Sequence, residues 1–155
     1  MELTELANEL VPRLKLPLPG ALAHEPIRAI SAGGIAPRFE HKLPPKPGSV
    51  LILLYPDQGS IKLPLTKRQT YAGAHSDQVS LPGGKTEPGE TSIDTALREA
   101  EEEIGIDRSQ VNVIGTLSNF FVIPSNFMIV PVIAYSTVKP VFKPDPFEVA
   151  RILTG

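Results

Sequence analysis

The sequence contains no cysteine among its 155 residues. Without thiols the chain can form neither disulfides nor zinc–thiolate sites, and it can carry no thiol nucleophile. It also lacks an excess of positive charge, because 15 Lys and Arg stand against 17 Asp and Glu, which gives a net charge of -2 and a pI of about 5.9. A stable nucleic-acid partner is therefore not expected, since broad binding to nucleic acid requires a basic surface.

Long apolar segments are missing as well. The N-terminus carries acidic residues early and has no apolar core of the signal-peptide type. The longest apolar run, around residues 127–135, is shorter than the roughly 20 residues that span a bilayer. We expect no membrane association, and a cytoplasmic location fits the absence of cysteine. Apolar residues still make up 41% of the chain, which is enough for one compact domain with a core.

Proline and glycine mark the organisation of the N-terminal third. Residues 3–14 have the apolar spacing of a short amphipathic helix, with Thr4 as its expected cap. Residues 16–47 are rich in Pro and Gly and predict an irregular arm with one short strand near residues 27–30, or a plain linker in part. We therefore assign residues 1–47 to an N-terminal helix and arm, and residues 48–155 to the main domain.

The main domain alternates between strand and helix patterns. The run SVLILLY at residues 49–55 is typical of a strand buried on both faces, and the turn after it predicts a hairpin with residues 61–66. Further strands are expected at residues 79–81, 111–117 and 128–135. Helices are expected at residues 91–104 and 144–152, the second with Asp145 near its cap. This order predicts an α/β fold in which helices pack on a mixed sheet.

The helix expected at residues 91–104 carries an acidic face. Its apolar residues, at positions 93, 97, 100 and 104, share the face that should contact a core. Glu99, Glu102 and Glu103 fall within an arc of about 100° that points away from that core. Like charges so close repel one another, and hard divalent cations such as Mg²⁺ prefer carboxylate oxygens. The ordinary alternative is a solvated acidic face.

The loop before this helix favours a site over a solvated face. Pro82-Gly83-Gly84 directly follows a strand, and two glycines let the backbone approach a ligand or metal closely. A second tight turn follows at residues 87–90. Thr91 and Asp94 then form a Thr-x-x-Asp pattern similar to a capping box. A solvated helix would not require this ordered loop.

The segment from Gly84 to Ile106 resembles the Nudix box, G-x5-E-x7-R-E-U-x-E-E-x-G-U, in which U is an aliphatic residue. Every fixed position of the pattern is filled in this chain. The matching residues are Gly84, Glu90, Arg98, Glu99, Ala100, Glu102, Glu103, Gly105 and Ile106.

The resemblance implies an α/β/α sandwich and a hydrolase that cuts diphosphates with the help of Mg²⁺ or Mn²⁺. It implies that Glu99, Glu102, Glu103 and the Gly83 carbonyl hold the metal. It leaves the base open between one of the ligands Glu102 and Glu103 and a residue of a later loop. Cations neutralise the phosphate charge, and a carboxylate takes the proton from the attacking water. Arg98 and Glu90 are then expected to pair and hold the loop against the helix.

One glutamate outside the box could also approach the site. Glu148 is the one late glutamate with this potential, and an exposed helix residue is its simpler interpretation.

Residues outside the box resemble the coenzyme A diphosphatase branch, whose pattern is near L-L-T-x-R-S-x3-R-x3-G-x3-F-P-G-G. The chain keeps six of its positions, Leu65, Thr66, Arg68, Pro82, Gly83 and Gly84. It departs at Gln69, Gly73, Asp77 and Leu81. Gly73 replaces an arginine that could hold a phosphate, and Asp77 adds a negative charge, so both changes count against coenzyme A.

Coenzyme A or an acyl derivative remains the first substrate expectation, and ADP-ribose, NADH or another nucleoside diphosphate conjugate is the alternative. Candidate phosphate contacts are Lys67, Arg68, His75 and Lys85. The aromatic residues Tyr71, Phe120, Phe121 and Phe127 could stack on a base, although core packing is the stronger expectation for the three phenylalanines.

Two other functions remain alternatives for the same domain. A binding domain without catalysis is one alternative, which the complete carboxylate triad disfavours, and a triphosphate hydrolase is another. The resemblance also leaves room for a homodimer, because many relatives form dimers.

Overall fold

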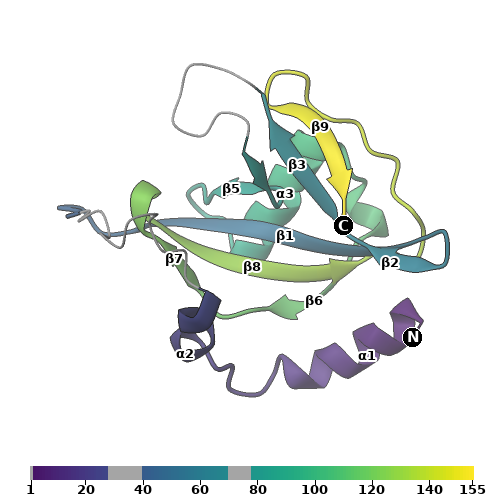
Figure 1. Cartoon of the computed structure of the whole chain (residues 1–155), viewed down its shortest axis with the longest axis horizontal. Helices are drawn as coiled ribbons and strands as arrows, with labels where there is room; N and C mark the ends of the chain where they lie inside the picture. Colours follow the sequence, from purple (N-terminus) through teal and green to yellow (C-terminus); the bar gives the residue numbers. More distant parts are fainter. Residues whose placement is uncertain (1, 28–39, 70–77) are drawn as a thin grey trace.

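The computed structural model describes residues 2–27, 40–69 and 78–155, and Figure 1 shows its arrangement. The helices are α1 (Leu3–Arg13), α2 (Ala21–His24) and α3 (Ser92–Ile104), with short 3-10 turns η1 (Glu25–Ile27), η2 (Arg108–Gln110) and η3 (Ile123–Ser125). The strands are β1 (Lys46–Asp57), β2 (Ser60–Lys62), β3 (Pro64–Arg68), β4 (Val79–Ser80), β5 (Gly83–Lys85), β6 (Asn112–Thr116), β7 (Phe120–Val122), β8 (Phe127–Tyr135) and β9 (Val149–Thr154).

The main sheet is mixed and is built around β1 and β8. These two strands run parallel, from the pair Lys46 and Phe127 to the pair Leu54 and Tyr135. The sheet order is β2-β1-β8-β6, with β5 also pairing with β1 and β7 with β8. The apolar run predicted as a strand lies in β1, where alternate residues are fully buried and those between them are mostly half-buried. The second face of β1 is therefore less buried than the run suggested.

Helices pack on this sheet in the arrangement expected of an α/β/α sandwich. Helix α3 packs against β1, β5 and β8, whereas α1 packs against β6 and β1 away from α3 (Figure 1). The core forms between α3 and the sheet, and its buried residues are Leu51, Leu53, Ala96, Ala100, Ile104, Ile106, Val132 and Ala134. None of the described helices is long and apolar enough to cross a membrane.

A smaller sheet, in the order β4-β3-β9, lies beside the main one (Figure 1). The hairpin expected after β1 forms only in part, because β2 pairs with β1 whereas β3 leaves to join β9. The switch occurs at Leu63, whose N–H and carbonyl both bond with Gly155 instead.

The helix expected at residues 144–152 is wrong, because Val149–Thr154 forms strand β9. The capping signal at Asp145 is real, since its Oδ1 accepts hydrogen bonds from the N–H groups of Phe147 and Glu148. That signal produces one turn, after which pairing with β3 draws the chain into an extended conformation.

The N-terminal segment differs from two of the expectations. The cap of α1 is Glu2, which forms a capping box with Glu5, and not Thr4. Of the strand expected near residues 27–30, only Ile27 lies within the described residues, and it ends η1.

Candidate active site

Helix α3 begins and ends where the sequence predicts. The Oγ1 of its N-cap Thr91 accepts from the Asp94 N–H at 3.2 Å, and Asp94 Oδ2 accepts from the Thr91 N–H at 2.9 Å. The helix ends at Gly105, whose φ of 67° is left-handed and whose N–H bonds to the Glu101 carbonyl. These local signals orient the helix so that its apolar face contacts the sheet and its glutamates lie beside β5.

The glycine loop enters the site as strand β5, antiparallel to β1. A Cβ atom on Gly83 would overlap the carbonyl oxygen of Ser49. A Cβ atom on Gly84 would lie 2.5 Å from the carboxylate carbon of Glu99. Close approach to the backbone of β1 therefore requires glycine at position 83, whereas a side chain at position 84 would displace the Glu99 carboxylate.

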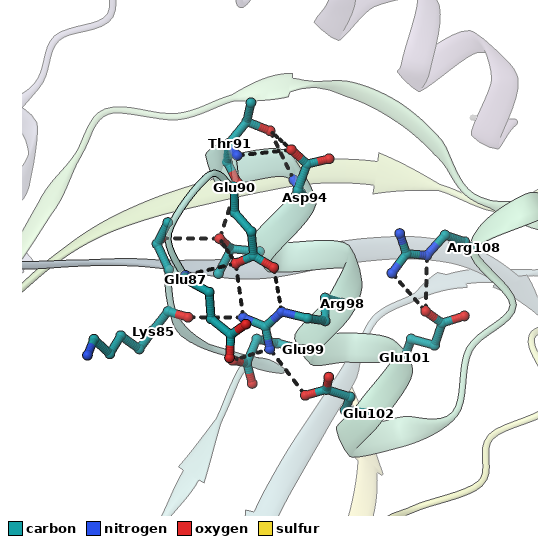
Figure 2. A network of polar contacts seen from close by, with 12 residues as sticks. Lys85, Glu87, Glu90, Thr91, Asp94, Arg98, Glu99, Glu101, Glu102 and Arg108 are labelled. Atoms are coloured by element: carbon teal, nitrogen blue, oxygen red, sulfur yellow. Dashed lines mark hydrogen bonds and ion pairs between the residues drawn. The ribbon is translucent and has the colours of Figure 1, made fainter.

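Arg98 is the centre of the polar network in Figure 2. Its Nε donates to Glu90 Oε1 at 2.5 Å, and its Nη2 donates to Glu90 Oε2 and to the Lys85 carbonyl, both at 3.1 Å. The Arg98 and Glu90 side chains are only 19% and 17% exposed. The guanidinium is the main reason that the pKa of Glu90 falls to about 2, with a further bond from the Glu87 N–H. Arg98 thus ties the turn at residues 87–90 to the helix.

Arg98 also contacts two of the expected metal ligands. Its Nη1 donates to Glu99 at 2.9 Å and to Glu102 at 3.1 Å. The Glu99 side chain is 17% exposed, whereas that of Glu102 is 60% exposed. Glu102 can therefore reorient at little cost, but Glu99 is confined between Arg98 and Gly84.

Glu103 is buried, which the sequence did not predict. The residue is 6% exposed, and its Oε2 accepts from the Gly83 N–H at 3.1 Å. Burial raises the pKa of Glu103 to about 7, opposed by the bond from Gly83, and the charges of Glu99 and Glu148 raise it further. The glycine loop covers this carboxylate, so of the three only Glu102 is well exposed to solvent.

The donor set suits a hard divalent cation. Three carboxylates and a loop carbonyl supply the oxygen ligands that Mg²⁺ and Mn²⁺ prefer. Gly84 leaves space beside the Glu99 carboxylate that a Cβ atom would fill. In the described parts of the chain no group of three or more acidic or histidine side chains is arranged to hold an ion, and Glu99 and Glu102 instead share Nη1 of Arg98. Ion binding at these residues would require both carboxylates to exchange that contact for the ion.

A cleft of about 470 Å³ adjoins the glycine loop. Two cationic side chains, Arg68 from β3 and Lys85 from β5, line it together with Gly83 and Gly84. Its apolar residues come mainly from β1, β7 and β8, and they include Val50, Val122, Phe127 and Ile129. The cleft can therefore hold anionic groups near the loop and an apolar or aromatic group against the sheet.

Two of the four candidate phosphate contacts line the cleft. Arg68 and Lys85 line the cleft, whereas Lys67 does not. His75 and Tyr71 lie outside the described residues, as do Gly73 and Asp77.

The core packing expected for Phe120 and Phe121 is wrong, because they are 43% and 38% exposed on the short strand β7. Phe127 is half-buried and lines the cleft. The sequence did not identify Val50, Val122 and Ile129 as cleft residues, although the continuous apolar runs of β1 and β8 indicated a second apolar face.

Glu148 is exposed as expected, but it lies in a turn before β9 and not in a helix. Its charge nevertheless acts on Glu99 and Glu103.

Comparison with known proteins agrees with this geometry. The NUDIX domain model matches residues 45–151. The chain is 41% identical to Nudix hydrolase 22, chloroplastic, of Arabidopsis thaliana over 70% of its own length and 37% of that protein. It is 33% identical to the Nudix hydrolase NudL of Pectobacterium atrosepticum, over 82% of this chain and 70% of that protein.

Among solved structures, a Nudix hydrolase from M. smegmatis, RenU, has the same fold. Its TM-score is 0.60 at 22% sequence identity, covering 72% of this chain and 71% of that one. The chain spans little more than a third of the length of the plant relative. With a family model that matches most of the chain, and with each fixed position of the Nudix box present, this chain belongs to the Nudix family.

Proposed function

We propose that this protein is a Mg²⁺- or Mn²⁺-dependent hydrolase that cleaves the diphosphate of a nucleoside diphosphate conjugate, with coenzyme A or an acyl-coenzyme A as its substrate. The observation that supports the proposal is the cleft, whose lining includes Arg68, Lys85 and the glycine loop, which contacts Glu103 through the Gly83 N–H. A site that binds a diphosphate needs cations for its oxygens, and a site that hydrolyses one needs a base.

Each residue then has a role. Glu99, Glu102, Glu103 and the Gly83 carbonyl would hold the ion, which supplies positive charge to the phosphate oxygens and acidifies water when bound. Arg68 and Lys85 would bind phosphate oxygens.

Glu102 or Glu103 would take a proton from the water whose oxygen attacks phosphorus. The bond from phosphorus to the bridging oxygen breaks, and coenzyme A would yield 3′,5′-ADP and phosphopantetheine.

Arg98 and Glu90 would position the loop of the site rather than take part in the reaction. Their paired contacts hold the turn at residues 87–90 and the Lys85 carbonyl against α3. We propose that neither contacts the substrate, and that their removal loosens the loop which carries Gly83 and Gly84.

A second conjugate, such as ADP-ribose or NADH, is favoured by one observation. The coenzyme A branch pattern has an arginine and a glycine where this chain has Gly73 and Asp77, which removes a cation and adds an anion. The apolar side of the cleft accepts a base or a pantetheine chain equally well, so the substrate must be found by experiment.

The test is product analysis by mass spectrometry after incubation with Mg²⁺ or Mn²⁺. The substrates are coenzyme A, acetyl-coenzyme A, ADP-ribose, NADH, a diadenosine polyphosphate and nucleoside triphosphates, and the Glu103→Gln variant serves as control. We expect phosphopantetheine and 3′,5′-ADP to appear fastest.

AMP from ADP-ribose or NADH alone would move the substrate to the second candidate. Cleavage of none of these compounds would contradict the hydrolase proposal and favour a nucleotide-binding domain.

A further inference from the structure

A second pocket adjoins the cleft at η3. Its volume is about 390 Å³, and Ser125 lines both the pocket and the cleft. The other residues that line the pocket come from residues 40–46 and from the end of η3, and they include Glu40, Lys42, Lys46 and Asn126. The segment that enters β1 therefore forms one wall of this pocket.

This segment is fastened to η3 along its whole length. The His41 Nε2 donates to the Ile123 carbonyl at 2.5 Å, and the Lys46 N–H donates to the Asn126 carbonyl at 2.8 Å. Asn126 is only 6% exposed, and its Nδ2 donates to the carbonyl groups of residues 43 and 44 at 3.1 and 3.3 Å. The backbone that carries the two lysines is thus held in place beside the cleft.

Lys46 lies on the cleft side of β1. Residues two apart on a strand share a face, so Lys46 shares the face of Val50, which lines the cleft. Gly48 lies between them and has no side chain. The Lys46 Nζ lies 5.2 Å from the ring centroid of Phe127, which also lines the cleft. The ammonium group is therefore at the border between the pocket and the cleft.

The strand register sets the spacing between Lys46 and the glycine-loop end of the cleft. Lys85, a cation of that end, pairs with Gly48. Lys46 lies two residues from Gly48 along β1, which is about 7 Å at the usual rise of a strand. A phosphate on a ribose lies one sugar away from a diphosphate on the same ribose. One nucleotide could therefore place its diphosphate near Lys85 and its ribose phosphate near Lys46.

The charge of the pocket suits an anion. Lys42 and Lys46 are exposed, and no ion pair among the described residues involves either of them. Glu40 is the one acid among the described lining residues, so the lining has one more positive than negative charge. The sequence also has Gly73 where the coenzyme A branch pattern has an arginine. A ribose phosphate must therefore find cations elsewhere in this chain.

We propose that Lys42 and Lys46 form a second anion subsite, which binds a phosphate monoester on the ribose of the substrate. The inference rests on the proposed function and deepens it, because it identifies the class of nucleotide conjugate that the site selects. Two substrates carry such a group, since coenzyme A has a 3′-phosphate and NADPH has a 2′-phosphate. ADP-ribose and NADH have none.

The experiment measures nucleotide binding to the whole protein by isothermal titration calorimetry, with a chelator present so that neither a cation nor turnover contributes. The ligands are 5′-AMP, 3′,5′-ADP and 2′,5′-ADP, which differ only in the ribose phosphate. The variants are Lys42→Met, Lys46→Met and their double variant, which lose charge, and Lys46→Arg, which keeps it. Lys15→Met is the matched control, because Lys15 is exposed and lines neither the pocket nor the cleft.

We expect the wild type and Lys15→Met to bind 3′,5′-ADP roughly tenfold more tightly than 5′-AMP, as two exposed ion pairs would give. The ratio should fall to roughly threefold in each single Met variant and toward one in the double variant, because each lysine supplies one of the pairs. Lys46→Arg should keep the full ratio.

Tighter binding of 2′,5′-ADP than of 3′,5′-ADP would support the subsite and contradict coenzyme A as the substrate. Wild-type protein that binds the three nucleotides equally, or binds none of them, would overturn the inference. A tenfold preference that survives in the double variant would overturn it as well.

Failure of the proposed function has a different signature, because the binding test needs no catalysis. Hydrolysis of coenzyme A and of dephospho-coenzyme A with equal kcat/KM would support the hydrolase and contradict the subsite. A preference for 3′,5′-ADP, with cleavage of neither compound in the presence of Mg²⁺, would contradict the hydrolase and support the subsite.

Discussion

The glutamates of the Nudix box are the same functional group in different surroundings. The Arg98 contact brings the pKa of Glu90 down to about 2, whereas burial raises that of Glu103 to about 7. The sequence predicts which glutamates share the side of α3 away from its apolar face, because helical spacing is a local property. It does not predict that Glu103 is buried, because the cover comes from the β5 loop, whose distance from the helix depends on the whole fold.

The ion pair of Glu90 and Arg98 should make stability depend on pH. Since the folded-state pKa of Glu90 is about 2 and its ordinary value is 4.5, the pair stabilises the folded protein fully above pH 4.5. This contribution is lost as the pH falls from 4.5 toward 2. We expect Glu90→Gln to unfold several degrees below the wild type at pH 7.

The measurement is thermal unfolding of both proteins from pH 7 to pH 2.5. Comparing the two proteins removes the effect of the other carboxylates, which titrate in both. A difference in unfolding temperature that stays constant below pH 4 would contradict the ion pair.

At the scale of elements, a helix or strand was predicted correctly where the residues that determine it lie within it or next to it in the sequence. Helix α3 was predicted within one residue, because its capping box and its terminal glycine are both within or next to the helix. Strand β9 was missed, because the turn at Asp145 starts like a helix and only the partner strand β3 decides otherwise. The path of β3 into a separate sheet was missed for the same reason.

The end of α3 allows a prediction with a matched control. Gly105 and Gly59 both have left-handed φ, of 67° and 76°. A Cβ atom on Gly105 would lie 2.6 Å from Lys143 Cβ and 2.7 Å from the Lys143 carbonyl oxygen, whereas one on Gly59 would meet nothing within 4 Å. Gly59→Ala should therefore destabilise the protein by about 1 kcal/mol, and Gly105→Ala by about 1–3 kcal/mol more.

Chemical denaturation at equilibrium measures both variants. Equal losses of unfolding free energy would show that the segment at Lys143 does not pack closely on the end of α3.

At the scale of the whole molecule, the order of strands and helices predicted a mixed sheet with helices packed on it, and the resemblance to the Nudix family implied the α/β/α sandwich. The fold confirms both. The cleft was not predicted, because its apolar residues come from β1, β7 and β8, which are far apart in sequence. Several expectations remain predictions, among them the domain boundary between residues 47 and 48, a homodimer and a cytoplasmic location. The last is untested, and one relative is named chloroplastic.

The packing of α1 on the sheet predicts a selective loss of stability. Leu3 is 7% exposed, whereas Leu16, just after the helix, is 65% exposed. Leu3→Ala should lower the unfolding free energy by about 2–3 kcal/mol, because it leaves a cavity between α1 and the sheet. Leu16→Ala should have almost no effect.

Denaturation curves test this, and turnover should be unchanged in both variants, since neither residue lines the cleft. A Leu3→Ala variant as stable as Leu16→Ala would show that α1 does not contribute to the fold.

The most direct test of the account is turnover measured against Mg²⁺ concentration, for the wild type and for Glu103→Gln. The variant keeps an oxygen that can accept from the Gly83 N–H, so its unfolding temperature should not fall. We expect wild-type turnover to vanish with a chelator and to return with Mg²⁺, and we expect turnover of Glu103→Gln to be about 100-fold lower than that of the wild type at saturating Mg²⁺. Wild-type turnover in Glu103→Gln at saturating Mg²⁺ would contradict a cation site built on the carboxylates of α3.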